Sequence, residues 1–132
     1  MQFRRKGKGF TLIEVMIVVV IVGILASIAY PSYTKYVAKG ARSDAIAEMM
    51  RIANLQEQHY LDFRRYTADM KELGYGADPM ETERGLYQID ATVNGASFEV
   101  KAIALGTQAA RDAECTPLTL SSTGAKTKPE CW

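Results

Sequence analysis

A long apolar run near the start of the chain constrains its fold more than any other feature. Between Phe10 and Tyr30 only Thr11, Glu14 and Ser27 are clearly polar, in a stretch of 21 residues. As an α-helix rising about 1.5 Å per residue, this stretch is about 31 Å long, which matches the hydrocarbon thickness of a bilayer. The run therefore predicts a membrane-spanning helix.

The residues ahead of the run predict its orientation. Arg4, Arg5, Lys6 and Lys8 occur there without any acidic residue. Positive charge marks the cytoplasmic side of a span, so the N-terminus is expected in the cytoplasm. An ordinary secretory signal is an alternative, because Ser27-Ile28-Ala29 is a poor form of its small-x-small cleavage site. The apolar run is longer than the about 7–15 residues of such signals and contains a glutamate.

Glu14 is the unusual residue of this span. An ionisable group costs roughly 2.5–3.5 kcal/mol at mid-bilayer on insertion scales and less near an end, so we expect Glu14 to have a partner. It follows Phe10 by one helical turn. A carboxylate that merely reaches the headgroup region is the alternative.

The hexapeptide Gly9-Phe10-Thr11-Leu12-Ile13-Glu14, followed by an apolar helix, resembles the processing site of type IV prepilins. The resemblance implies that residues 1–9 are a leader peptide, which a dedicated peptidase on the cytoplasmic side removes by cutting after Gly9. The same enzyme would methylate Phe10, the new N-terminal residue. The resemblance also implies an assembly role for Glu14, because the α-amine exposed on Phe10 can neutralise this carboxylate in the same chain or in a neighbouring subunit.

The resemblance covers nearly the whole chain and implies an α+β, pilin-like fold. A long N-terminal helix, with a membrane half at 10–30 and an amphipathic half at 31–62, would pack on an antiparallel sheet of three to four strands in a head formed by 63–132. Pro31 separates the halves, where it either kinks the helix or ends it. Within the span, a pair of small residues four positions apart lets helices approach closely. This pair is Gly23 and Ser27.

The second half of the helix is amphipathic. Apolar side chains that recur with the helical period predict a stripe facing the core. The stripe consists of Ile46, Met49, Met50, Ala53, Tyr60 and Leu61. His59 lies on the opposite face, where we expect a solvated side chain rather than a metal ligand or catalytic base. Glu57 falls in the middle of the stripe, which implies a partner, and arginine is a candidate.

An alternating pattern on both sides of Asn94-Gly95 predicts a β-hairpin. If these two residues form the loop, Ile89 pairs with Val100 on the apolar face. The same register sets Asp90 opposite Glu99 on the other face, which is mildly unfavourable.

Shorter elements are expected between the helix and the hairpin. Thr67 can cap a short helix over 68–73 that Gly74 ends. The glycines and the proline that follow argue against further regular structure before Gly85. In pilins this segment lies on the outside of the filament, so the resemblance implies an exposed, subunit-specific surface.

The C-terminal part contains both cysteines, Cys115 and Cys131. In an exported head a disulfide between them is favoured, as in the cysteine-bounded region of pilins, and two unpaired thiols are the alternative. The bond would stabilise the head by about 3 kcal/mol. We expect a loop over 106–114, a third strand over 117–120 and a brief fourth strand over 125–128.

The sequence carries no pattern typical of an enzyme, a cofactor site or a metal site. It has one histidine, no nucleophile elbow, no phosphate-binding glycine motif and no zinc spacing. Without the leader's four basic residues, 12 of the 16 Lys and Arg remain against 15 Asp and Glu, a net charge of −3. This balance argues against a dedicated nucleic-acid binder. Lys126 and Lys128 in the cysteine loop could contact phosphate, but two lysines beside Glu130 are a weak signal.

The sequence therefore predicts a non-enzymatic structural subunit of a type IV pilus, most similar to PilE-like minor pilins. Its precursor would cross the inner membrane once, with the head outside, and its partners would be prepilin peptidase and other pilin subunits. The filament would serve adhesion, twitching motility or DNA uptake. One alternative is a pseudopilin of a type II secretion system, although a late disulfide loop without an acidic calcium cluster favours the pilus. A signal-anchored periplasmic binding domain is the alternative from another class.

Overall fold

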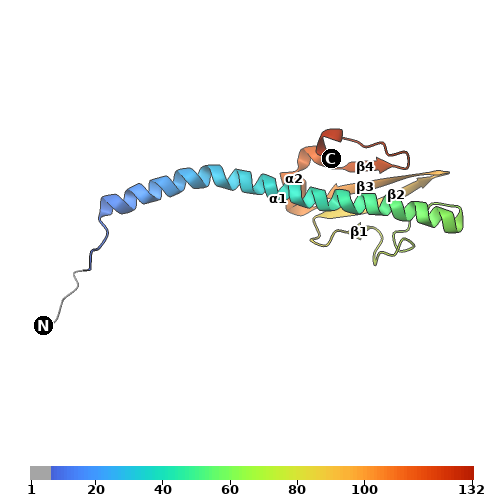
Figure 1. Cartoon of the computed structure of the whole chain (residues 1–132), viewed down its shortest axis with the longest axis horizontal. Coiled ribbons are helices and arrows are strands. Elements are labelled where there is room, and N and C mark those ends of the chain that lie inside the picture. Colours follow the sequence, from blue (N-terminus) through green and yellow to red (C-terminus); the bar gives the residue numbers. More distant parts are fainter. Residues whose placement is uncertain (1–6) are drawn as a thin grey trace. The chain divides into compact units, whose positions relative to one another are not determined.

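The computed structural model describes residues 7–132 and contains two compact units, Met1–Thr34 and Lys35–Trp132. Three basic residues of the expected leader, Arg4, Arg5 and Lys6, lie outside the described residues. One helix, α1 (Leu12–Phe63), contributes to both units (Figure 1). It begins two residues later and ends one residue later than the sequence predicts.

In the first unit, α1 presents an apolar surface with no protein packed on it. Its apolar stretch is long enough to cross a membrane, and none of that stretch is buried. A helix that is apolar all round needs non-aqueous surroundings. This part of α1 therefore needs either lipid or other helices around it.

α1 continues through Pro31. The alternative in which this proline ends the helix is therefore wrong, whereas a kink stays a prediction. Pro31 has no N–H to donate to the carbonyl of Ser27. Hydroxyl groups nearby bond to their own helix: Ser27 Oγ donates to the Ile24 carbonyl at 2.7 Å, and Ser32 Oγ donates to the Ile28 carbonyl at 3.1 Å.

The second unit contains a four-stranded antiparallel sheet in the order β1-β2-β3-β4. Its strands are β1 (Met80–Glu81), β2 (Tyr87–Asn94), β3 (Ser97–Ala104) and β4 (Leu118–Ser121). Each strand pairs with the next one along the chain, so the sheet is a meander (Figure 1). The predicted α+β fold and the third predicted strand are confirmed. The short β1 lies where the sequence argued against regular structure.

The second half of α1 packs on one face of this sheet (Figure 1). The helix contributes Ala41, Ala45, Met49 and Ile52, none of them more than 3% exposed. Alternate residues of three strands form the opposing layer: Tyr87, Ile89, Ala91, Phe98, Val100, Ala102, Ala104, Leu118 and Leu120. The period of two along the strands places these side chains on one face, which explains the single core.

The buried stripe of α1 differs from the predicted one. Its members are Ala38, Ala41, Ala45, Met49, Ile52, Gln56 and His59. Met49 is buried as predicted, but Met50 and Leu61 are 43% and 72% exposed. The stripe begins with three alanines and ends in two polar residues, so hydrophobicity alone places its axis incorrectly.

Two polar residues near the end of α1 have exposures opposite to those predicted. His59 is buried, with its ring 4.6 Å from the ring of Phe63 and its Nε2 3.7 Å from the Glu72 carboxylate. The prediction of a solvated His59 side chain is therefore wrong. Glu57 lies at the surface, where it accepts a hydrogen bond from the Tyr66 hydroxyl at 3.2 Å. Its partner is a tyrosine and not an arginine.

The predicted hairpin is confirmed, but its predicted register is wrong by two residues. Asn94 pairs with Ser97, so the two-residue loop is Gly95-Ala96, with Gly95 at a φ of 59°. Ile89 still shares the buried face with Val100, because a shift of two preserves the alternation. The shift places Asp90 opposite Lys101, which removes the expected repulsion with Glu99.

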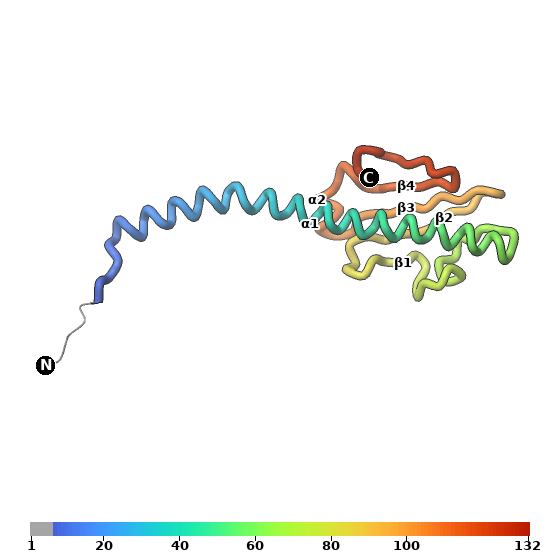
Figure 2. Tube along the Cα trace, viewed as in Figure 1, coloured from blue at the N-terminus to red at the C-terminus, as the bar shows by residue number. Residues whose placement is uncertain are grey.

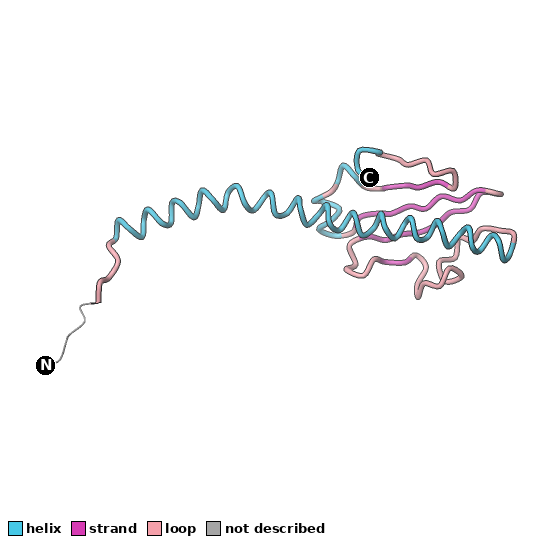
Figure 3. The backbone as a smooth tube through the Cα atoms, in the orientation of Figure 1, coloured by secondary structure: helices cyan, strands magenta, loops and turns pink. Residues whose placement is uncertain are grey.

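Several short segments also differ from the expectations. Thr67 Oγ1 accepts a hydrogen bond from the Asp69 N–H and Gly74 has a φ of 98°, but turns rather than a helix connect them. The expected loop at 106–114 contains α2 (Gly106–Arg111) and leads into a 3-10 turn, η1 (Ala113–Cys115). Figure 3 shows α2 as a short helical segment, which lies between β3 and β4 along the chain.

The chain ends beside β4, as Figure 2 shows, after a 3-10 turn η2 (Pro129–Cys131). A single bridge joins Lys126 to Leu120 where a fourth strand over 125–128 was expected. A disulfide joins Cys115 to Cys131, as predicted. It closes the C-terminal segment onto the head.

Candidate functional site

The expected processing site lies in a non-helical segment. Residues 7–11 precede α1, and all of them are exposed. Phe10, whose amide nitrogen belongs to the expected scissile bond, has a side chain 82% exposed. The bond between Gly9 and Phe10 is thus open to another protein.

Thr11 caps the start of α1. Its carbonyl accepts the first helical hydrogen bond, from the Val15 N–H at 3.2 Å, and its hydroxyl accepts one from the Glu14 N–H at 3.3 Å. This geometry defines an N-cap, and the spacing Thr11-x-x-Glu14 is that of a capping box. The sequence motif predicts a role for Glu14. The cap at Thr11 was not predicted, although the Thr-x-x-Glu pattern before an apolar run is visible in the sequence.

Glu14 lies in the first turn of α1, where a carboxylate interacts favourably with the helix dipole. It borders a shallow hollow of about 230 Å³ that is otherwise apolar, lined by Phe10, Val15, Val18 and Val19. Within residues 7–132, no basic side chain forms an ion pair with Glu14.

The small-residue pair in the span is exposed on α1. Apart from its chain neighbours and the adjacent backbone of α1, no heavy atom lies within 4 Å of the position where a Cβ on Gly23 would be. The Ser27 hydroxyl is satisfied within its own helix, so it needs no partner from outside. This face can therefore accept a second helix at short range.

A polar network connects the helix of the head to the sheet. The Gln108 amide donates to the Ala38 carbonyl at 2.8 Å and to the Tyr87 hydroxyl at 3.0 Å. Tyr87 in turn donates to Asp112 at 3.0 Å, and Arg42 donates to the same carboxylate at 2.6 Å. Tyr87 is fully buried, and this burial raises the pKa of Tyr87 to about 12. The network has no sequence signature, because its members are far apart in the chain.

The segment after α1 is held to the helix by further polar contacts. The Gln56 side-chain amide donates to the Thr67 carbonyl at 2.6 Å and accepts a hydrogen bond from the Thr67 N–H at 3.0 Å. The Tyr75 hydroxyl donates to Glu48 at 2.5 Å, and burial together with this hydrogen bond raises the pKa of Tyr75. These contacts give the segment a defined conformation despite its lack of long regular elements.

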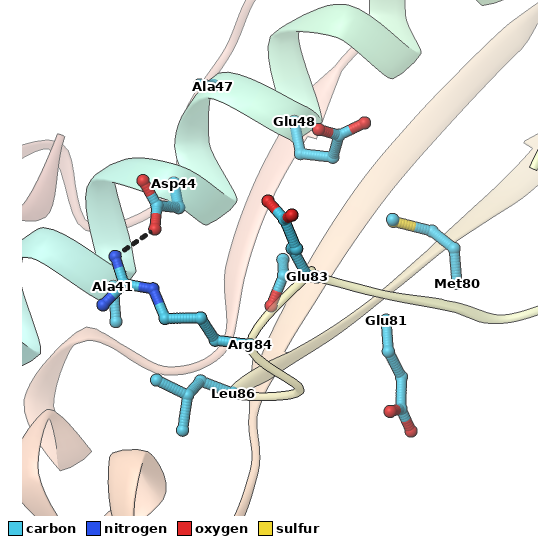
Figure 4. Close-up of a pocket in the computed structure, with 10 residues that line it drawn as sticks. Ala41, Asp44, Ala47, Glu48, Met80, Glu81, Glu83, Arg84 and Leu86 are labelled. Carbon is cyan, nitrogen blue, oxygen red and sulfur yellow. Dashed lines mark hydrogen bonds and ion pairs between the residues drawn. The ribbon is translucent and has the colours of Figure 1, made fainter.

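A groove of about 570 Å³ lies between α1 and the segment around β1 (Figure 4). Its rim carries carboxylates from both sides, including Glu48 and Glu83. Arg84 crosses it to form an ion pair with Asp44 at 2.6 Å. Residues 7–132 contain no cluster of three side chains suited to hold a metal ion.

The two lysines of the C-terminal loop differ in their contacts. The Lys128 ammonium donates to the Thr116 carbonyl at 2.9 Å, so it is engaged within the loop. Lys126 is exposed, and its Nζ lies 4.9 Å from the centre of the Trp132 ring. The Trp132 indole donates to the Thr127 carbonyl at 2.9 Å, which fixes the ring.

Comparison with known families identifies the family of the chain. A family profile described as "Type IV minor pilin ComP, DNA uptake sequence receptor" matches residues 31–119, about two thirds of the chain. A second profile, the "Prokaryotic N-terminal methylation motif", matches residues 4–30. The chain belongs to the type IV pilin family. Between them, the two profiles cover the span and most of the head of this pilin.

Individual relatives agree with this assignment. The pilin is 31% identical over 115 residues to a type IV major pilin protein PilE1 of Neisseria gonorrhoeae, covering 80% of this chain and 70% of that protein. It is 36% identical over 90 residues to the type IV major pilin protein PilA of Myxococcus xanthus, covering 68% of this chain but only 40% of that protein. A type II secretion system core protein G of Aeromonas hydrophila is 35% identical over 91 residues, 69% of this chain and 52% of that protein.

Proposed function

We propose that this chain is a minor subunit of a type IV pilus. The observation that carries the proposal is the methylation motif joined to a head that matches a minor-pilin family. The precursor crosses the inner membrane once through α1, with its N-terminus in the cytoplasm and its head outside. Prepilin peptidase cuts after Gly9, and Phe10 becomes the methylated N-terminal residue.

Assembly moves α1 from lipid into a bundle of helices. Packed apolar helices replace acyl chains around the exposed part of α1, so the transfer keeps its apolar surface away from water. Glu14 has no basic partner among residues 7–132, follows Phe10 by four residues and lines the same hollow as Phe10. The α-amine created on Phe10 neutralises this carboxylate in the same subunit or in a neighbour, which favours docking in the filament. The filament serves adhesion, twitching motility or DNA uptake.

Two measurements test this proposal. Intact mass of the chain from cells should show loss of residues 1–9 and one added methyl group on Phe10. Filaments sheared from the surface should contain the chain at a small fraction of the principal subunit. An uncleaved chain would contradict the processing, and a protein that is required for secretion but absent from surface filaments would favour the pseudopilin alternative.

A second candidate function is DNA contact by the head. The description of the matched family names a DNA uptake sequence receptor. In this chain, exposed Lys126 lies over Trp132, and exposed Lys101 lies on β3 opposite Thr119 of β4. Lysines contact phosphates and an aromatic ring can stack on a base. Lys128 is engaged with a backbone carbonyl, so Lys126 is the better candidate of the two loop lysines.

Binding of labelled DNA tests this candidate. We expect the affinity of the chain to fall steeply between about 50 and 200 mM salt, because phosphate contacts release counterions. Lys101→Ala and Lys126→Ala should each weaken binding and reduce the salt slope by about one. Lys71→Ala, at another exposed lysine, is the matched control. Equal binding by all three variants would contradict DNA contact by these two lysines.

A further inference from the structure

The cap at Thr11 suggests a function beyond the stability of α1. Thr11 lies one residue after Phe10, so the point where α1 begins decides whether the expected scissile bond belongs to the helix. An independent observation is the match to the N-terminal methylation motif, which covers residues 4–30 and therefore includes this bond. The conformation of the bond is therefore relevant to its processing.

The hydrogen bonds at the start of α1 leave the scissile peptide group free. In a helix extended by one residue, the Glu14 N–H would donate to the Phe10 carbonyl. It donates instead to the Thr11 hydroxyl. No backbone N–H among residues 7–132 donates to the carbonyl of Gly9, which is the carbonyl that hydrolysis attacks.

The residues around Thr11 define where the helix would begin without this cap. Leu12 and Ile13 belong to the residue types least suited to the N-cap position, whereas glycine is tolerated there. Upstream of Thr11, Phe10 has no side-chain acceptor, so Gly9 is the next suitable cap. With Gly9 as the cap, its carbonyl would accept the first helical hydrogen bond, from the Ile13 N–H. The scissile carbonyl would then be held within the helix.

We infer that Thr11 is a positioning residue for leader removal, because its hydroxyl starts α1 at Leu12 and keeps the Gly9–Phe10 bond in free, non-helical backbone. The inference rests on the proposed cleavage after Gly9. Water adds across this amide, so that Gly9 leaves with the new carboxylate and Phe10 keeps the new α-ammonium. An enzyme binds the backbone of a peptide substrate most readily in extended form, where both its N–H and C=O groups are unpaired. Glu14 supports the same helix start through its place in the first turn.

Substitutions at Thr11 separate capping from direct recognition of the hydroxyl. The experiment uses the full chain in lipid vesicles with purified prepilin peptidase, and intact mass gives the initial rate of cleavage after Gly9. Thr11→Val keeps the shape but removes the acceptor, and we expect a rate about five-fold lower. Thr11→Ser and Thr11→Asn both keep a capping acceptor and should be cut at close to the original rate.

The outcomes distinguish this inference from the proposed function. An original chain that is not cut at all would overturn the proposed processing itself. Cleavage of Thr11→Val at the original rate would overturn the role of the cap alone. Slow cleavage of Thr11→Asn beside normal cleavage of Thr11→Ser would also overturn it, in favour of recognition of the hydroxyl by the enzyme. As a structural readout, the backbone NMR shifts of Gly9 and Phe10 should become helical in Thr11→Val, and unchanged shifts would contradict the inference.

Discussion

Arg42 of α1 and Asp112, which follows α2, form an ion pair with 2.6 Å between Nη1 and Oδ1, although 70 positions separate them in the chain. Both side chains are largely buried, at 15% and 11% exposed. The second oxygen of Asp112 accepts a hydrogen bond from the Tyr87 hydroxyl at 3.0 Å. The pair thus connects the helix, the sheet and the segment around α2 at a single carboxylate.

Breaking this pair should destabilise the head. Asp112→Asn leaves the Arg42 charge without its partner, and we expect a loss of about 2–3 kcal/mol, somewhat less than for a fully buried pair. The measurement is urea unfolding of the full chain in detergent micelles, followed by near-UV circular dichroism. Asp44→Asn is the matched control, because the Asp44–Arg84 pair has the same 2.6 Å distance but is more than half exposed. It should cost less than about 1 kcal/mol, and equal losses would contradict the importance of burial.

The stability of the head should fall at alkaline pH. Burial raises the pKa of Tyr87 to about 12, above its ordinary value of 10.0. Below pH 10.0 the stability that the raised pKa of Tyr87 contributes is fully present. It is lost as the pH rises towards 12, because the unfolded state releases the phenolic proton first. The loss is about 1.4 kcal/mol per pH unit for one tyrosine in this window.

Urea unfolding of the full chain at pH values on both sides of 10 measures this effect. Tyr66 and Tyr75 also have a raised pKa and act in the same direction. Tyr87→Phe should therefore reduce the slope of stability against pH without abolishing it. A slope unchanged by this substitution would show that Tyr87 does not contribute.

The parts of the fold that depend on local pattern were predictable from the sequence. The apolar run predicted α1, and the alternation around Asn94-Gly95 predicted β2 and β3 with their apolar residues on the buried face. The register was not predictable from the turn dipeptide alone. Gly95 supplies the positive φ at the first loop position instead of the second, and the resulting shift brings Asp90 opposite Lys101. A cross-strand charge pair thus agrees with the observed register where the dipeptide rule does not.

Features that depend on distant contacts were not predictable. His59 is buried because Phe63 and Glu72 cover it. Phe63 lies one helical turn further along α1, but the contact with Glu72 does not follow from the helical period. α2 forms at a place that reads as a loop, and its Gln108 is 1% exposed because it bonds to the Ala38 carbonyl and to Tyr87. At the candidate site, Glu14 was recognised from the motif, whereas the cap at Thr11 was identified from its hydrogen bonds, although its Thr-x-x-Glu spacing is visible in the sequence.

Loss of the disulfide should lower the stability of the head. Cys115 and Cys131 are 16 positions apart, and a loop of this size corresponds to about 3 kcal/mol in the chain-entropy account. Thermal unfolding of the full chain with and without a reducing agent measures the difference. The double substitution Cys115→Ser and Cys131→Ser should match the reduced chain and show no further response to reductant. A response of the double variant would indicate that the reductant acts elsewhere.

Loss of the Glu14 carboxylate should impair assembly. Glu14→Val removes the charge that the Phe10 α-amine would neutralise, and Glu14→Gln removes the charge but keeps a polar side chain. We expect both variants to remain in the inner membrane and to be depleted from sheared filaments by about tenfold or more, which corresponds to a loss of about 1.4 kcal/mol in docking. Intact mass establishes whether each variant is cut after Gly9, so that an assembly defect is not confused with a processing defect. Glu83→Gln, at an exposed position of the head, is the control. A normal amount of cleaved Glu14→Val in the filaments would remove the argument that this carboxylate docks the subunit.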